Sequence, residues 1–158
     1  METLEPLLAE HPYFKGLKPE MIATIAGCAA NARFEAGQYL FREGEEANQF
    51  FILRHGKIAV EAASLTVGPV VIQTYSDGEI LGWSWLVPPY RWRFSGKATE
   101  LTRLLLLDGK CLRGKCEIDH ELGYELLKRF ADILASRLDA TRMQLIDMYA
   151  APKKGGRR

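Results

Sequence analysis

The spacing of apolar residues changes along the chain, and each change marks a different kind of predicted structure. Leu4, Leu7 and Leu8 recur at helical spacing near the start, and Pro19 stands where a second helix would open. From Asn31 on, short β-branched and aromatic runs are separated by glycines. This pattern predicts two N-terminal helices followed by a small β-barrel or sandwich, rather than an α/β layer.

Three runs in the β-rich region are predicted strands. Residues 50–53 form a short apolar run that ends before Gly56, and residues 67–75 form a second β-rich stretch. Residues 101–107 contain consecutive leucines and precede Asp108 and Gly109. We expect this last run to be a late strand that is fully buried.

The last third of the chain is predicted to be one long helix, because residues 119–149 contain no proline and Gly123 is their single glycine. Residues at alternating spacings of three and four form a seam: Tyr124, Leu127, Ala131, Leu134, Leu138, Thr141, Leu145 and Met148. We expect the C-terminal half of this seam to form a homodimer. The alternative is that the stripe packs on the chain's own barrel, and both can hold in different parts.

Composition narrows the class of protein. The chain has 158 residues, of which 47% are hydrophobic, as expected for one globular domain. Its 21 Lys and Arg residues balance 20 Asp and Glu residues, so the overall charge of the chain does not favour binding to nucleic acid or to a membrane surface. The chain shows neither a signal peptide nor a transmembrane run, and three cysteines at low density favour a reduced, cytoplasmic protein. The basic residues 151–158 are expected to be a disordered tail, with a phosphate-binding arm as the second interpretation.

Residues 34–60 carry three glycines, Gly37, Gly44 and Gly56, with an apolar quartet before the third. This segment resembles the first half of cyclic-nucleotide-binding domains of the catabolite activator/Fnr type. The resemblance implies a mainly β fold, a jelly-roll barrel at 34–109, flanked by N-terminal helices at 1–33 and C-terminal helices at 110–150. In that family a phosphate-binding cassette holds the ligand inside the barrel.

Residues 78–99 match this cassette. The resemblance implies that Glu79 accepts a hydrogen bond from a ribose hydroxyl and that Arg91 binds the phosphate, with Arg93 as the competing arginine. A short helix after the glycine turn is expected to present free backbone N–H groups to the phosphate. The expected ligand-binding set in this segment is Gly78, Glu79, Ile80, Leu81, Arg91, Trp92 and Arg93.

The segment departs from the family at its tryptophans. Trp92 stands where the family usually has a small hydroxyl residue, and Trp83 and Trp85 lie nearby. They either fill the barrel mouth as core or dimer packing, or reshape the pocket for a different or planar ligand. Trp92 could also fill the space of a cyclic phosphate. The resemblance makes cyclic AMP or another cyclic nucleotide the candidate ligand. Because of the tryptophans, the alternative is a degenerate member of the family that binds no nucleotide and serves as an interaction or dimerisation module.

One further match lies in the predicted long helix. Thr141 matches the family threonine that reaches the purine, often across the dimer, although it could equally be a tolerated polar residue of the seam. Arg142 follows it where the best-known cyclic AMP receptor has serine. Thr141 and Arg142 complete the expected ligand-binding set.

Other chemistry has weaker signals. Cys111, Cys116 and His120 make a poor zinc pattern, and structural cysteines are favoured over a redox switch. The redox alternative rests on the flanking Lys110, Arg113 and Lys115, which would lower the pKa values of the Cys111 and Cys116 thiols. No catalytic triad can be nominated, so an enzyme is not expected. Few residues follow the long helix, so sequence-specific DNA binding is not expected either, and the output would pass to a separate partner protein.

Overall fold

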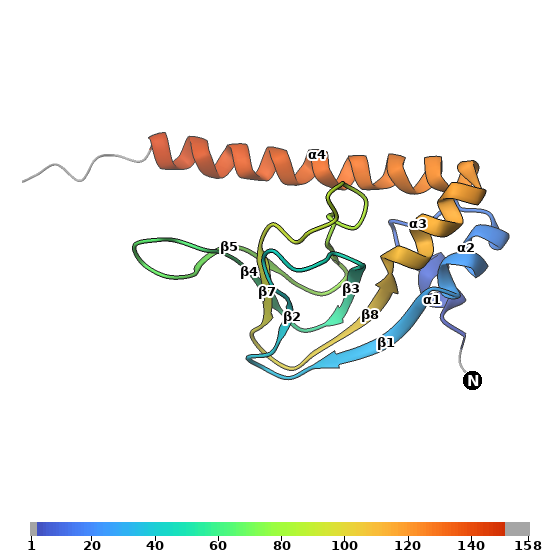
Figure 1. The fold of residues 1–158 in the computed structure, drawn as a ribbon, viewed down its shortest axis with the longest axis horizontal. Coiled ribbons are helices and arrows are strands. Elements are labelled where there is room, and N and C mark those ends of the chain that lie inside the picture. Colours follow the sequence, from blue (N-terminus) through green and yellow to red (C-terminus); the bar gives the residue numbers. More distant parts are fainter. Residues whose placement is uncertain (1–2, 151–158) are drawn as a thin grey trace, which may run out of the picture. The chain divides into compact units, whose positions relative to one another are not determined.

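The N-terminal part contains two short helices. The computed structural model describes residues 3–150, in which α1 covers Glu5–Glu10 and α2 covers Pro19–Ala26 (Figure 1). Pro19 lies in the first turn of α2, where its missing N–H costs no helical hydrogen bond. Met21, Ile22 and Ile25 of α2 are buried. The two predicted N-terminal helices are therefore confirmed.

The middle of the chain folds into two antiparallel sheets of four strands each. One sheet has the order β1-β8-β3-β6 and the other the order β2-β7-β4-β5. The strands are β1 (Ala29–Phe34), β2 (Tyr39–Phe41), β3 (Gln49–His55), β4 (Ile58–Ala62), β5 (Val70–Tyr75), β6 (Ile80–Leu81), β7 (Ser95–Ala98) and β8 (Thr102–Asp108). This β-roll with flanking helices confirms the predicted fold class.

The late leucine run forms the centre of the first sheet. Strand β8 lies between β1 and β3, with Leu106 opposite both Ala30 and Phe51. Leu104, Leu105 and Leu107 are almost completely buried, as the apolar run predicted. Strand β1 begins at Ala29 and pairs with β8, so the first strand starts five residues before the residue-34 start that we expected for the barrel.

Apolar side chains from both sheets form one core. Its fully or nearly fully buried members are Phe41, Ala47, Phe51, Leu53, Ile58, Val60, Tyr75, Leu81, Trp92 and Leu104. Ser84 and Thr102 are the buried polar residues in the described part of the chain. The interior of the roll is therefore predominantly apolar.

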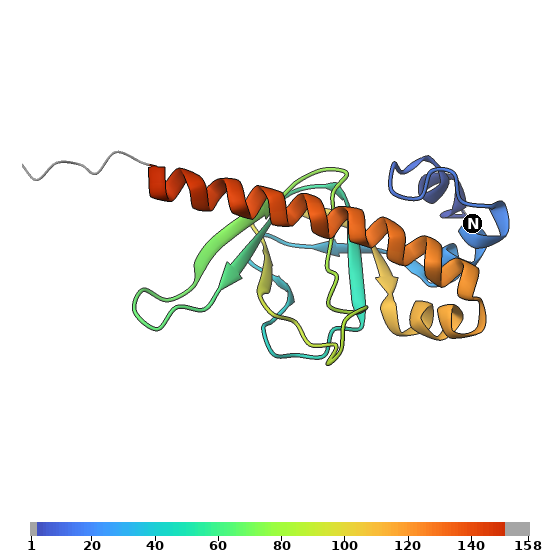
Figure 2. The same ribbon diagram turned by 90° about the horizontal axis from the view of Figure 1, so that it is seen from above.

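Two helices follow the roll. Helix α3 covers Gly109–Ile118 and begins with Asp108, whose side chain accepts a hydrogen bond from the Cys111 amide. Helices α1, α2 and α3 all lie at the end of the roll where β1 begins and β8 ends (Figure 2). Helix α4 covers His120–Ala150 and confirms the predicted long helix.

The chain divides into two compact units, one up to Gly123 and one from Tyr124 on. The second unit, as far as it is described, is the part of helix α4 that follows Gly123. Tyr124, Leu138, Leu145 and Met148 of the predicted seam have exposed side chains. The predicted basic tail at 151–158 lies outside the described residues, and the division into helices, barrel and tail stays a prediction.

Candidate ligand-binding site

The first residues of the candidate cassette are hydrogen-bonded to strand β3. The Gly78 amide donates to the Leu53 carbonyl at 2.8 Å, and the Leu53 amide donates to the Glu79 carbonyl at 3.0 Å. Ile80 and Leu81 form β6, pair with β3 and are buried, at 7% and 3% exposure. This part of the cassette is therefore a strand anchored in the first sheet.

The expected short helix is absent from residues 78–93, which is a correction to the sequence interpretation. Residues 84–89 form turns and a bend instead, and the Leu86 and Val87 amides donate to the carbonyls of Trp83 and Ser84. The sequence between Val87 and Tyr90 is Pro88-Pro89, and proline cannot supply the amide donors that a helix needs. Any N–H groups for an anion must come from a loop.

Glu79 closes its own turn. Its Oε2 accepts a hydrogen bond from the Ser76 amide at 2.7 Å, and the residue is half-buried. Gly78, directly before Glu79, has a φ of 84°. This conformation favours glycine, so the turn restricts the residue type at position 78. The carboxylate is thus held beside the first residues of the cassette.

The two candidate arginines lie on the solvent side of the chain. Arg91 and Arg93 are exposed, whereas Trp92 between them is buried, as expected for alternating directions in extended chain. Arg91 Nη1 donates to the Gly44 carbonyl at 3.0 Å, and the backbones of Arg91 and Glu46 pair in an isolated antiparallel β-bridge. The Arg93 guanidinium lies 5.3 Å from the centre of the Trp83 ring, within cation–π range.

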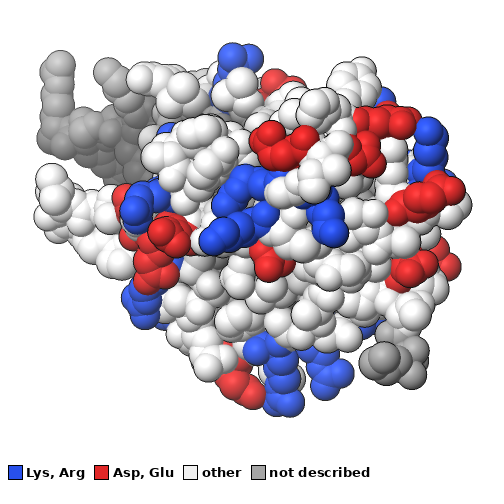
Figure 3. All heavy atoms as spheres, turned by 45° about the vertical axis from the view of Figure 1, so that its right-hand side comes forward, with Lys and Arg blue, Asp and Glu red and all other residues white. Residues whose placement is uncertain are grey.

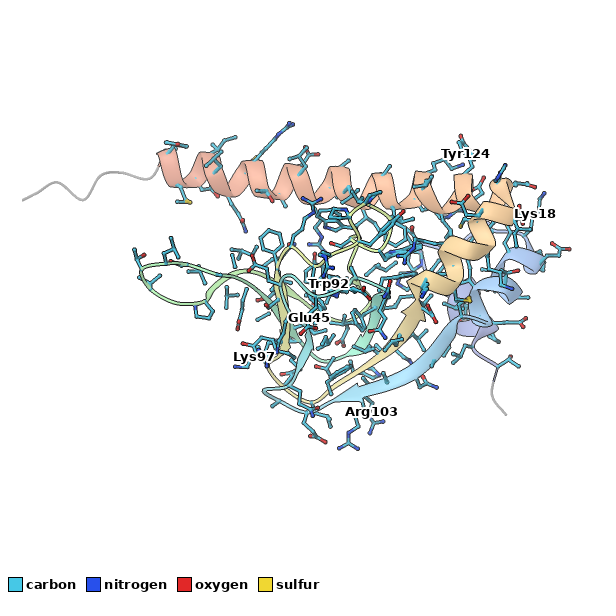
Figure 4. All side chains as sticks on the ribbon, in the orientation of Figure 1. Lys18, Glu45, Trp92, Lys97, Arg103 and Tyr124 are labelled. Carbon is cyan, nitrogen blue, oxygen red and sulfur yellow. A yellow bond between two sulfur atoms is a disulfide. The ribbon has the colours of Figure 1, made fainter. Side chains whose placement is uncertain are left out.

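Two of the three tryptophans belong to the core. Trp92 is 6% exposed and stacks on Phe41 with 3.8 Å between ring centres, in the interior of the roll (Figure 4). Trp85 is fully buried and stacks on Phe50 at 4.9 Å. A Cβ on Gly82 would lie 3.0 Å from Trp92, so the glycine makes room for this ring. Trp92 therefore occupies space inside the roll.

Arg113 of α3 is a functional candidate that the sequence analysis did not assign to the site. Its guanidinium donates to the Trp85 carbonyl at 2.6 Å and to Asn48 Oδ1 at 2.8 Å. It also lies 4.2 Å from the centre of the Tyr90 ring. Nothing in the local pattern around Arg113 indicates these contacts, since Trp85 is 28 residues away.

Thr141 and Arg142 lie on α4, in the second unit, and both are exposed. Thr141 Oγ1 donates to the Arg137 carbonyl one turn earlier at 2.9 Å, a common local bond for a threonine in a helix. Their assignment to the ligand site stays a prediction.

The cysteines differ from expectation. Cys28 and Cys111 form a disulfide, and Cys116 is free, so the expectation of reduced thiols is wrong for this pair. The candidate dithiol of Cys111 and Cys116 is wrong as well. The pKa of the Cys116 thiol is raised, first by burial and then by Asp119 and Glu117. We expected the Arg113 charge to lower the pKa values of the thiols, but the Arg113 guanidinium donates its hydrogen bonds to Asn48 and Trp85 instead.

The surface carries both signs of charge. Figure 3 shows both Lys and Arg side chains and Asp and Glu side chains on the visible face, with several of the basic side chains near its centre. Among residues 3–150, no helix is both long and apolar enough to cross a membrane. The same residues contain no group of three His, Cys, Asp or Glu side chains placed to hold a metal ion.

Comparison with known proteins decides the family. The model of the cyclic nucleotide-binding domain matches residues 32–119, which is more than half of the chain. The chain belongs to the cyclic nucleotide-binding domain family. Human cGMP-dependent protein kinase 2 is 37% identical over 71 residues, 43% of this chain and 9% of the kinase. A cAMP-dependent protein kinase regulatory subunit from Emericella nidulans is 32% identical over 79 residues, 49% of this chain and 18% of the subunit. The chain thus matches less than one fifth of either curated relative.

Solved structures agree with this family. A protein from Geobacter metallireducens, named as cyclic nucleotide-binding, superposes with a TM-score of 0.77 at 27% identity, covering 87% of this chain and 99% of that one. The catabolite activator protein of Thermus thermophilus superposes with a TM-score of 0.68 at 22% identity, covering 87% and 63%. These superpositions confirm the expected fold, which this cyclic nucleotide-binding domain shares with the catabolite activator protein. The family is regulatory and typically not enzymatic.

Proposed function

We propose that this domain is a regulatory module that binds a small anionic ligand, with a cyclic nucleotide as the first candidate. The family match to residues 32–119 carries the proposal, because it includes the whole candidate cassette. The proposed ligand contacts are a ribose hydroxyl on Glu79 and a phosphate on Arg91, with Arg93 as the second cation. Thr141 and Arg142 are the proposed contacts to the base.

The chemistry of Arg91 supports a phosphate partner. Its guanidinium contacts the neutral Gly44 carbonyl, and among residues 3–150 it forms no ion pair with a carboxylate. An arginine in this state can exchange a carbonyl for two phosphate oxygens, which form stronger, charge-assisted hydrogen bonds. Glu79 is already held in its turn by the Ser76 amide, so little side-chain ordering would be needed on binding.

The proposed output passes through α4. Ligand binding would change the arrangement of the cassette, shift the long helices of a homodimer and alter a surface that a separate partner protein recognises. Such a shift requires that the ligand bind one of two states more tightly than the other.

The second candidate function is a family member that binds no nucleotide and serves as an interaction or dimerisation module. The burial of Trp92 favours it, because the ring stacks on Phe41 inside the roll, and Trp92 rather than a small hydroxyl residue follows Arg91 in the sequence. A nucleotide phosphate near Arg91 would have to fit beside this ring or move it.

A cytoplasmic location stays a prediction. The disulfide between Cys28 and Cys111 argues against it, because such bonds persist mainly in oxidising compartments.

Calorimetric titration with cyclic AMP and cyclic GMP separates the two candidate functions. We expect saturable binding by the wild type and an affinity about ten- to hundredfold lower in Arg91→Ala, the usual effect of removing a charged hydrogen bond. Arg93→Ala tests the competing arginine in the same way. Arg103→Ala is the matched control, because Arg103 is exposed on the outer side of β8 (Figure 4).

Tryptophan fluorescence gives an independent readout, since Trp83, Trp85 and Trp92 all lie in the cassette. A ligand that occupies the site changes the emission, whereas a pure scaffold gives no response. Absence of both heat and emission change with either nucleotide would reject nucleotide binding and favour the interaction module.

A further inference from the structure

Arg113 connects three separate segments through one guanidinium group. Nη1 donates to the Trp85 carbonyl at 2.6 Å and to the Ala47 carbonyl at 3.4 Å. Nη2 donates to Asn48 Oδ1 at 2.8 Å. Helix α3, the loop before β3 and the cassette loop at 83–90 are thereby joined at a single side chain.

Tyr90 completes the arrangement. The Arg113 guanidinium lies 4.2 Å from the Tyr90 ring centre, and the Ala47 amide donates to the Tyr90 carbonyl at 2.7 Å. Tyr90 has a φ of 57°, which is unfavourable for a residue with a side chain and persists only where its surroundings hold it. The ring contact and the backbone bond are two of the interactions that hold it.

The contacts require the geometry of arginine as well as its charge. The acceptors of Arg113 are two backbone carbonyls and an amide oxygen, and among residues 3–150 no carboxylate pairs with it. A planar guanidinium can donate in several directions and present a face to an aromatic ring, whereas an ammonium cannot do both. The role of Arg113 is therefore to fix the position of its neighbours rather than to neutralise a charge.

We propose that Arg113 is the positioning residue of the cassette: it holds residues 83–90 in one arrangement before ligand arrives and makes this arrangement depend on the position of α3. The consequence for ligand affinity rests on the proposed function, but the effect on the free protein does not.

Amide hydrogen exchange of the ligand-free protein tests this proposal. The reporters are the Leu86, Val87 and Tyr90 amides, which are hydrogen-bonded within the cassette loop. We expect Arg113→Gln and Arg113→Lys to speed exchange at these amides by about tenfold or more, while the amides of β3 keep wild-type rates. Arg103→Gln is the control, because it removes an exposed arginine outside these contacts.

Three results would overturn the proposal. Unchanged exchange at 83–90 in both variants would show that Arg113 does not hold the loop. Equal acceleration in β3 would show a general loss of stability, and wild-type behaviour of Arg113→Lys would show that charge alone suffices. A nucleotide titration of the same variants is a separate arm. If the wild type binds, we expect both variants to bind at least tenfold more weakly; if it does not, the proposed function fails while the exchange result still decides the role of Arg113.

Discussion

Gly37, Gly44 and Gly56 look equivalent in the sequence, since each punctuates a strand boundary in the first half of the domain. All three have positive φ values, 92°, 88° and 126°. Their surroundings differ: a Cβ on Gly37 or Gly44 would meet nothing within 4 Å, whereas a Cβ on Gly56 would lie 2.7 Å from Cα of Thr102. The backbone of β8 therefore requires glycine at position 56 for a reason that the turn conformation does not supply.

At the residue scale, we predict that Gly56→Ala destabilises the domain more than Gly44→Ala. Both variants pay the cost of an alanine at positive φ, about 1 kcal/mol. Only Gly56→Ala also forces the Thr102 backbone to move, which adds about 1–3 kcal/mol. Urea unfolding followed by circular dichroism measures the difference, and equal losses in the two variants would contradict the close contact.

The elements at the end of the roll are joined covalently as well as by packing. The disulfide connects Cys28, directly before β1, to Cys111 in the first turn of α3, and it closes a loop with a sequence separation of 83. Lys18, before α2, also forms an ion pair with Glu121 at the start of α4. Both side chains of that pair are about 60% exposed, so it adds little stability beside the covalent bond.

At the element scale, we predict that reducing the disulfide lowers the free energy of unfolding by about 2–4 kcal/mol, because a long loop of the unfolded chain is released. Cys28→Ser and Cys111→Ser should show the same loss without reductant, and Cys116→Ser should not. Thiol counting by mass spectrometry should find one free thiol before reduction and three after it. Three free thiols in the untreated protein would contradict the pairing.

At the scale of the whole molecule, helix α4 exposes more apolar side chains than is usual for a helix that contacts only solvent. Leu127, Leu138, Leu145 and Met148 of the seam are each at least 50% exposed. Contiguous apolar surface of this kind is typical of interaction sites. The pKa of the Glu125 carboxyl, near the start of α4, is lowered because Arg129 and Lys128 donate hydrogen bonds to it. The charged side chains in this part of the helix therefore pair with one another.

We predict that the proposed homodimer depends on this seam. Leu138→Asp introduces a charge into the seam and should shift the protein toward monomer in sedimentation experiments at micromolar concentration. Ala140→Asp adds the same carboxylate to an exposed position outside the seam and should leave the association unchanged. A monomeric wild type, or equal effects of the two variants, would reject dimerisation through the seam.

Most elements of the fold could be predicted from local patterns. Apolar residues at alternating intervals of three and four predicted helix α4, and the run of leucines predicted strand β8. Both patterns lie within a single element, so they can be read from neighbouring residues. Strand β1 begins at Ala29, before the change of pattern at Asn31, and local spacing does not mark this start because Ala30, Asn31 and Arg33 are exposed. Its strand conformation comes from pairing with β8, which no local pattern contains.

The candidate site was predictable only in part. The spacing of residues in the sequence predicted two of its features. These are the glycine turn at Gly78 with Glu79 after it, and the alternation of Arg91, Trp92 and Arg93. The short helix expected after the glycine turn is replaced by turns, and the contacts of Arg113 come from a different element. Such contacts join residues that are far apart in sequence, so spacing alone carries no signal for them.

The sequence by itself indicated two N-terminal helices, a β-rich middle, a long C-terminal helix and the family, because hydrophobic periodicity and glycine turns act over a few residues. The position of the cassette stays a prediction. Only the tertiary structure decided that Cys111 pairs with Cys28 rather than Cys116, that Trp92 packs against Phe41 inside the roll, and that Arg113 joins α3 to the cassette. Each of these depends on the path of the chain in space, since the partners meet only after both sheets have formed.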